Sequence, residues 1–174
     1  MVGVYTFSEA QITSNSFTFK EKEVLADTSN FDLLSKEGLN ELAFKTQNVA
    51  TKVDFEKKKA SFKANDDLTI VQFPRNQYIC YLNQFTWDMV TKQIELGNPE
   101  ALSKEGTAPG LHFYSVHPRQ DTLNFKSTYA KYDLNKYIID AYQVPHIDVA
   151  DSRILPHKDS IIRIREEAKM RTIN

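Results

Sequence analysis

The chain has 174 residues, of which 41% are hydrophobic and 26% charged, with 22 basic and 23 acidic side chains. This length and apolar content indicate one folded domain over residues 1–174 and exclude a low-complexity linker protein. The near balance of charge argues against nucleic-acid binding through a broad positive field, and the single cysteine, Cys80, excludes an intrachain disulfide and a cysteine-based metal cluster.

The N-terminal residues lack a basic leader followed by a long apolar region, and no stretch has the length that spans a bilayer. We therefore expect a soluble, cytoplasmic protein without a membrane contact. From Val2 to Lys20 apolar residues recur at every second position, as in Val2–Val4 and Phe17–Phe19. This alternation predicts two short strands.

A helix is predicted next, because Thr28, Ser29 and Asn30 offer capping oxygens before apolar residues that recur at steps of three and four up to Ala43. Gly38 weakens or breaks it. Residues 46–67 show only fragments of alternation and several lysines and aspartates, which predicts a ragged strand and loop and leaves open a mobile connection.

The clearest β signal lies in residues 68–82, where two runs rich in β-branched and aromatic residues flank the turn residues 74–76. This predicts a hairpin. Trp87, Val90 and Ile94 have helical spacing, which predicts a helix from about Thr86 to Gly97. A second short helix is predicted over residues 98–106.

Residues 111–129 read as another hairpin, because alternating apolar residues flank the turn His117–Asp121. Residues 137–144 read as a strand that ends at Pro145. For residues 160–173 the pattern leaves helix and strand open. The fold predicted from these elements is α+β, with antiparallel β-hairpins and two or three helices packed on one face.

Histidines provide few candidates for a metal site. His112 and His117 are five residues apart, a separation that sends their side chains to opposite faces of a continuous strand. His146 and His157 lie in predicted loops without the spacing of a recognised zinc site. We expect no metal site, and the absence of glycine-rich phosphate or dinucleotide motifs leads us to expect no cofactor. Whether the segment with His112 and His117 is a site or part of the core stays open.

One enzymatic alternative comes from the order of three segments: Gly110–Tyr114, Ser127–Tyr129 and the apolar strand 137–144. Over residues 110–144 this order resembles that of ADP-ribosyltransferase-like folds. The resemblance implies an enzyme or domain that binds nicotinamide dinucleotide, with an arginine or histidine that holds the dinucleotide and a glutamate that stabilises the developing cation. Its candidate residues here are His112, Tyr129 and Glu166, with Arg75 and Glu167 as further candidates.

The favoured interpretation is non-enzymatic. Eight tyrosines and eleven phenylalanines exceed what a core of this size accommodates, so some tyrosines should stand at the surface, where amphipathic rings anchor interfaces. We expect an interaction or assembly protein that binds a protein partner or forms a homo-oligomer through a tyrosine-rich hairpin surface. The composition suits an accessory or structural protein of a phage or virus, which would place it in a virion. The predicted binding residues are Tyr78, Tyr81, Tyr114, Arg119, Tyr129 and Tyr132.

Overall fold

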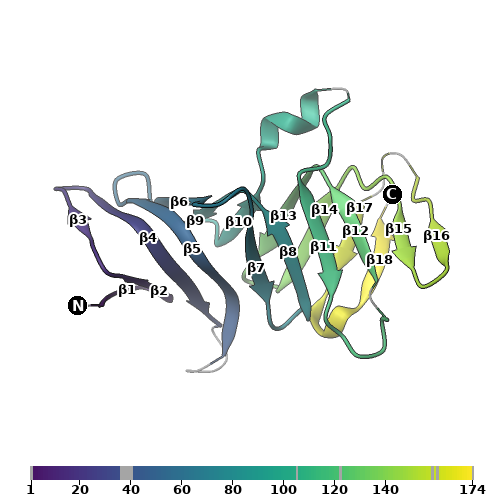
Figure 1. Cartoon of the computed structure of the whole chain (residues 1–174), viewed down its shortest axis with the longest axis horizontal. Helices are drawn as coiled ribbons and strands as arrows, with labels where there is room; N and C mark the ends of the chain where they lie inside the picture. The colour runs from purple at the N-terminus through teal and green to yellow at the C-terminus, as the bar shows by residue number, and fades with distance from the viewer. Residues whose placement is uncertain are drawn as a thin grey trace.

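The computed structural model describes residues 2–35, 41–104, 106–121, 123–157, 159 and 161–173. These residues form 18 strands, and every pairing between them is antiparallel (Figure 1). The strands are β1 (Gly3–Phe7), β2 (Ala10–Ser14), β3 (Thr18–Phe19), β4 (Glu23–Leu34), β5 (Leu42–Asp54), β6 (Lys59–Ala64), β7 (Thr69–Phe73), β8 (Tyr78–Leu82), β9 (Gln84–Asp88), β10 (Gln93–Leu96), β11 (Leu111–Ser115), β12 (Asn124–Ser127), β13 (Tyr129–Asp133), β14 (Ile138–Tyr142), β15 (Ile147–Val149), β16 (Ser152–Ile154), β17 (Ile161–Ile164) and β18 (Met170–Ile173).

The predicted α+β class is wrong, because the described residues contain no α-helix. Their only helical segments are two short 3₁₀ turns, η1 (Pro99–Ser103) and η2 (Glu166–Ala168). The helix predicted around residues 28–43 is the end of β4 and the start of β5, and Gly38 lies outside the described residues. The helix predicted over 86–97 is the hairpin of β9 and β10, and η1 replaces the one predicted over 98–106.

The long strand β5 is the branch point of the sheet. It pairs with β4 along most of its length, with β6 over Val49–Asp54 and with β7 at Lys45 and Thr46. The first branch continues from β6 through β9, β10, β13, β14 and β17 to β18. The second branch continues from β7 through β8, β11 and β12 to β15 and β16. Beyond β6 the chain therefore adds successive hairpins to the two branches in turn.

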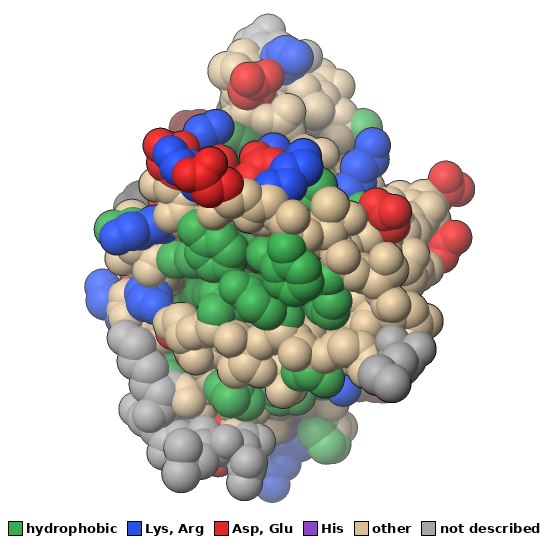
Figure 2. Space-filling view, turned by 90° about the vertical axis from the view of Figure 1, so that its left-hand side faces the viewer, with side chains coloured by type: hydrophobic (Ala, Val, Ile, Leu, Met, Phe, Trp, Pro, Cys, Tyr) green, Lys and Arg blue, Asp and Glu red, His purple; other side chains and the backbone are tan. Residues whose placement is uncertain are grey.

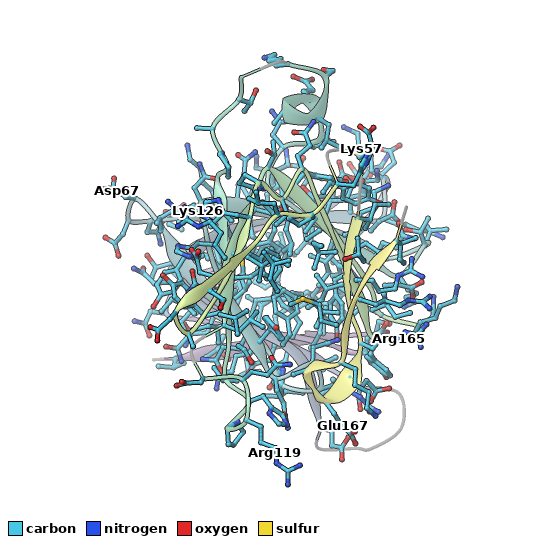
Figure 3. The ribbon with its side chains drawn as sticks, turned by 90° about the vertical axis from the view of Figure 1, so that its right-hand side faces the viewer. Lys57, Asp67, Arg119, Lys126, Arg165 and Glu167 are labelled. Carbon is cyan, nitrogen blue, oxygen red and sulfur yellow. The ribbon has the colours of Figure 1, made fainter. Side chains whose placement is uncertain are left out.

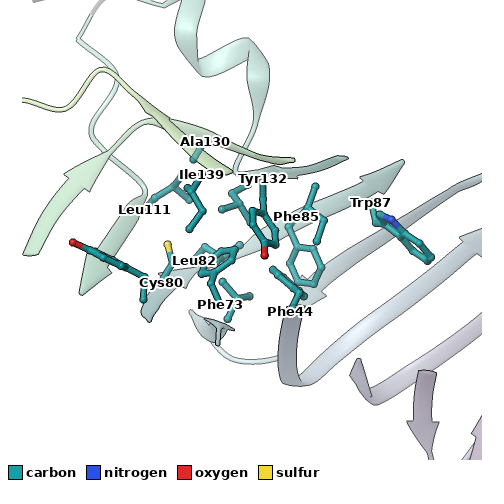
Figure 4. Close-up of a cluster of buried hydrophobic side chains, with 14 of the residues drawn as sticks. Phe44, Phe73, Cys80, Leu82, Phe85, Trp87, Leu111, Ala130, Tyr132 and Ile139 are labelled. Atoms are coloured by element: carbon teal, nitrogen blue, oxygen red, sulfur yellow. The ribbon is translucent and has the colours of Figure 1, made fainter. Parts of the chain in front are cut away.

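The core lies between the two branches. Buried residues alternate along most strands, so each branch turns one apolar face inward. Phe73 of the second branch contacts Tyr132 of the first at 5.0 Å between ring centroids (Figure 4). The Tyr132 hydroxyl donates to the carbonyl oxygen of Ala43 at 3.2 Å, which satisfies its one polar atom inside the core. Phe62 and Phe85 stack at 4.5 Å and extend the core toward the N-terminal strands.

Several hairpins share one turn design. Asp54, Asp88 and Asp133 each end a strand, and the carboxylate of each accepts backbone N–H groups two or three residues later at 2.8–3.2 Å. The last residue of each four-residue turn has a positive φ. The aspartate carboxylate therefore accepts from turn N–H groups, which have no partner in the hydrogen-bond ladder between the strands.

The predicted hairpin over residues 68–82 is confirmed as β7 and β8 in register, with Phe73 opposite Tyr78. Residues 46–67 contain most of β5 and all of β6, which pair with each other. At the end left open between helix and strand, η2 separates the paired strands β17 and β18.

Candidate functional site

The outer face of the second branch carries a group of half-exposed aromatic side chains. The pairing registers place its outward-facing residues in two cross-strand rows. Within them, the His112 ring lies 4.2 Å from the Tyr114 ring, and Tyr114 lies 5.7 Å from Tyr81, in an edge-on arrangement. We call Tyr81, His112 and Tyr114 the outer cluster. The first row is Ile70, Tyr81, His112 and Lys126, and the second is Gln72, Ile79, Tyr114 and Asn124.

Two hydrogen bonds fix the imidazole of His112. Its Nδ1 lies 3.2 Å from the Tyr114 hydroxyl, and its Nε2 lies 3.1 Å from Oδ1 of Asn124. A neutral ring with its hydrogen on Nε2 satisfies both contacts, since Nε2 then donates to the amide oxygen and Nδ1 accepts from the hydroxyl. The ring is thus a positioned part of the surface, and it holds the tyrosine ring beside it.

A hollow of about 330 Å³ lies against the outer cluster. Tyr81, His112 and Tyr114 form part of its wall, together with Leu68 and the exposed Lys126, which Figure 3 shows on the flank of the ribbon. Leu68 is 51% exposed and the adjacent Ile70 is 40% exposed. The surface therefore combines apolar area with one cation, a composition that suits recognition of another protein.

The hollow has no activated nucleophile among its described lining residues. Cys80 is on the same strand as Tyr81 but points to the opposite, inner face, where it is fully buried. Burial raises the pKa of its thiol well above the usual range. This cysteine is a core residue.

The structure divides the predicted binding residues between surface and core. Tyr81 and Tyr114 lie on the outer face, and Arg119 is exposed in the turn between β11 and β12, at the lower tip of the ribbon in Figure 3. The other three are in the core: Tyr78 is 1% exposed, Tyr129 2% and Tyr132 0%. These three rings cannot reach a partner while the protein is folded, and burial raises the pKa of each hydroxyl.

The residues of the enzymatic alternative have separate contacts. His112 contacts Tyr114 and Asn124 on the outer face, whereas Tyr129 is buried in the first branch against Tyr142. Glu166 accepts hydrogen bonds from the guanidinium of Arg75 at 2.7 and 3.0 Å. The structure thus brings together Arg75 and Glu166, as a structural ion pair between the β7–β8 turn and η2.

A wider hollow of about 940 Å³ lies between η1 and the loops that follow β14 and β16. Its described ionisable lining groups are Lys104, Tyr142 and Asp159. The hydroxyls of Ser103 and Thr107 in its wall donate to backbone carbonyl oxygens of the same loop at 2.8 and 2.9 Å. Neither hydroxyl has a general base as its hydrogen-bond partner, so the arrangement does not resemble an activated nucleophile.

Sequence reasoning did not single out a second surface, at the N-terminal end of the molecule. Its rings contact one another at centroid distances of 5.3–6.4 Å. Figure 2 views this end and shows hydrophobic side chains gathered at the centre of the face, with charged groups above them. The alternation Val2–Val4 and Phe17–Phe19 indicated strands, but Val2 and Val4 are exposed, and it is Tyr5, on the opposite face of β1, that contacts Phe17 and Phe19. We call this surface the aromatic end: Tyr5, Phe7, Phe17, Phe19 and Phe55.

Among the described residues, no helix combines the length and apolar character needed to cross a bilayer. Nor do those residues place three or more histidine, cysteine, aspartate or glutamate side chains where they could share a metal ion. No protein-family model matches the chain, and comparison with curated proteins and with solved structures likewise found no match.

Proposed function

We propose that this protein is a non-enzymatic interaction or assembly protein that binds a protein partner through the outer face of β7, β8, β11 and β12. One observation carries the proposal: Tyr81, His112 and Tyr114 form a contiguous aromatic surface beside the exposed side chains of Leu68 and Ile70. Isolated apolar side chains are common on protein surfaces, whereas a contiguous group beside a hollow is typical of a binding site.

The physical properties of the outer cluster suit an anchor. Tyrosine rings lose little conformational freedom on association, and the hydrogen bonds of His112 hold the Tyr114 ring in place before binding. Lys126 at the edge of the hollow favours a partner that presents an acidic group next to an apolar side chain. The partner would thus insert an apolar side chain against Tyr81 and place a carboxylate near Lys126.

The test begins with crosslinking. A photoreactive residue at Ile70, introduced in the source cells, should form a crosslink with one defined partner that mass spectrometry identifies. Binding of that purified partner is then measured by calorimetry. Replacement Tyr81→Ala or Tyr114→Ala should weaken it by at least about tenfold, the loss expected for an aromatic anchor.

Tyr142→Ala is the matched control, because Tyr142 is also a half-buried tyrosine but lies on β14 of the first branch. It should leave the affinity unchanged. Folded Tyr81→Ala and Tyr114→Ala variants that bind the partner as tightly as the unmodified protein would contradict the proposal. The phage or virus source stays a prediction from composition, and the location in the cytoplasm or in a virion stays a prediction from the sequence.

A further inference from the structure

Strand β1 is a free edge of the sheet. It pairs with β2, from Gly3 opposite Ser14 to Phe7 opposite Ala10, and no other strand among the described residues pairs with it. In an antiparallel ladder, residues alternate between those bonded to the neighbouring strand and those whose N–H and C=O point away. A two-residue turn joins Phe7 to Ala10, so this closing pair is bonded. The backbone groups of Val4 and Thr6 therefore point to the open side.

The sequence of β1 does not protect this edge. Gly3–Phe7 contains no charge and no proline, the two devices that usually block strand addition, and Val4 is 57% exposed. The other outer strands differ: β16 carries Arg153, β18 carries Arg171 and follows Lys169, and β3 has only two residues. Among the described edge strands, β1 has five residues available for pairing and carries neither a charge nor a proline.

The inner face of β1 adds apolar area to the open backbone. Tyr5 contacts Phe19 and Phe55, and Phe7 contacts Phe55, so β1 forms one border of the aromatic end. The charges nearby are paired within the chain, as in Lys22 with Glu56 at 3.0 Å and Lys52 with Glu23 at 2.7 Å. Two copies of this end can therefore approach without a net repulsion between like charges.

We propose that two copies of the chain associate through β1, which pairs antiparallel with β1 of the second copy about a two-fold axis at Tyr5. Such a pairing is isologous and closes at the dimer. It places Val4 opposite Thr6 of the second copy, so that every facing pair is uncharged, and it brings the two aromatic ends side by side. This interface is separate from the outer cluster and does not depend on the function proposed for it.

The first test is the mass in solution. Light scattering across a concentration series should show a species of twice the chain mass of 20.1 kDa. The double variant Val4→Lys, Thr6→Lys places like charges opposite one another twice, and it should raise the dimer dissociation constant about tenfold or more. Val116→Lys is the matched control, because Val116 is 55% exposed and follows β11, away from β1. It should leave the dimer intact.

A second test needs no variant. The amide hydrogens of Val4 and Thr6 should exchange more slowly as protein concentration rises, whereas that of Val116, which donates to the Gln77 carbonyl oxygen of the same chain at 2.9 Å, should not respond. A monomer at every concentration overturns the proposal. So does a dimer that survives the double lysine variant, or an open-ended series of oligomers, which would require β1 to pair with a different edge.

Discussion

Arg75 should contribute more to stability than any exposed ion pair of this protein. Its side chain is 15% exposed and donates from Nε and Nη2 to one carboxylate oxygen of Glu166, at 3.0 and 2.7 Å. Its guanidinium carbon also lies 4.1 Å from the centroid of the Tyr137 ring. These contacts connect the β7–β8 turn to η2 and to the β13–β14 turn, three segments far apart in the chain.

The expected loss on Arg75→Met follows from these contacts. A hydrogen-bonded charge pair contributes about 1.5–3 kcal/mol when buried, but Glu166 is 44% exposed, so about 1 kcal/mol is the appropriate share. The cation–π contact adds about 0.5–1 kcal/mol. We therefore expect the free energy of unfolding to fall by about 2 kcal/mol, and a double-mutant cycle with Glu166→Gln to give a coupling of about 1 kcal/mol.

Urea unfolding measures this directly, because Trp87 is the single tryptophan and is fully buried, so its fluorescence reports the transition. Lys169→Met is the control: Lys169 pairs with Glu167 at 2.8 Å, but both side chains are about 70% exposed. The free energy of unfolding of this variant should fall by less than about 0.5 kcal/mol. If Arg75→Met cost no more than this control, the view that the guanidinium joins three segments would be refuted.

Three further predictions concern single positions. Burial raises the pKa of Asp32, so stability falls as pH rises from the usual carboxyl pKa through the raised one; Asp32→Asn should raise the melting temperature at pH 7 but not at pH 3. Cys80 should react with iodoacetamide only at the rate of unfolding, and fast labelling of the native protein would show that it is accessible. Gly97→Ala should lower the free energy of unfolding more than Gly106→Ala. Both glycines have positive φ, but only at Gly97 would the new Cβ approach a backbone oxygen to 3.3 Å. Thermal unfolding of the two variants measures both losses, and equal losses would mean that the positive φ alone, and not the close contact, sets the loss of stability.

The helices predicted from spacing were wrong for a specific reason. Trp87 and Ile94, seven residues apart, lie directly opposite each other on β9 and β10, and Val90 lies in the four-residue turn between them, 68% exposed. A hairpin with a turn of this length places apolar residues at the spacing that two helical turns would give. The aspartate that begins the turn, Asp88, is the signal that separates the two cases, since its carboxylate accepts turn N–H groups.

Which tyrosines reach the surface could be predicted only in part. Once residues 78–82 are recognised as a strand, Tyr78 and Tyr81 must face opposite sides, because three is an odd separation. Parity does not say which side is the core. Which side is the core depends on the pairing of β8 with β11, a strand far along the chain, which puts Tyr81 beside His112 and Tyr78 opposite Ser115.

The sequence does not say which face of a strand turns to the core, and this holds for the whole fold because successive hairpins alternate between the two branches. A hairpin is local, and its turn can be recognised in the sequence where turn residues separate two β-rich runs, as between β7 and β8. Which face of a hairpin turns to the core, however, depends on the branch that the hairpin joins, and hairpins that follow one another in the chain join different branches. Tyr114 and Tyr132 illustrate the result: both lie on strands, yet Tyr114 belongs to the outer cluster and Tyr132 packs against Phe73 across the core. The surface on which the proposed function rests is therefore a product of strand pairing between distant segments, and the affinity of a partner for Tyr81 and Tyr114 variants tests that pairing together with the function.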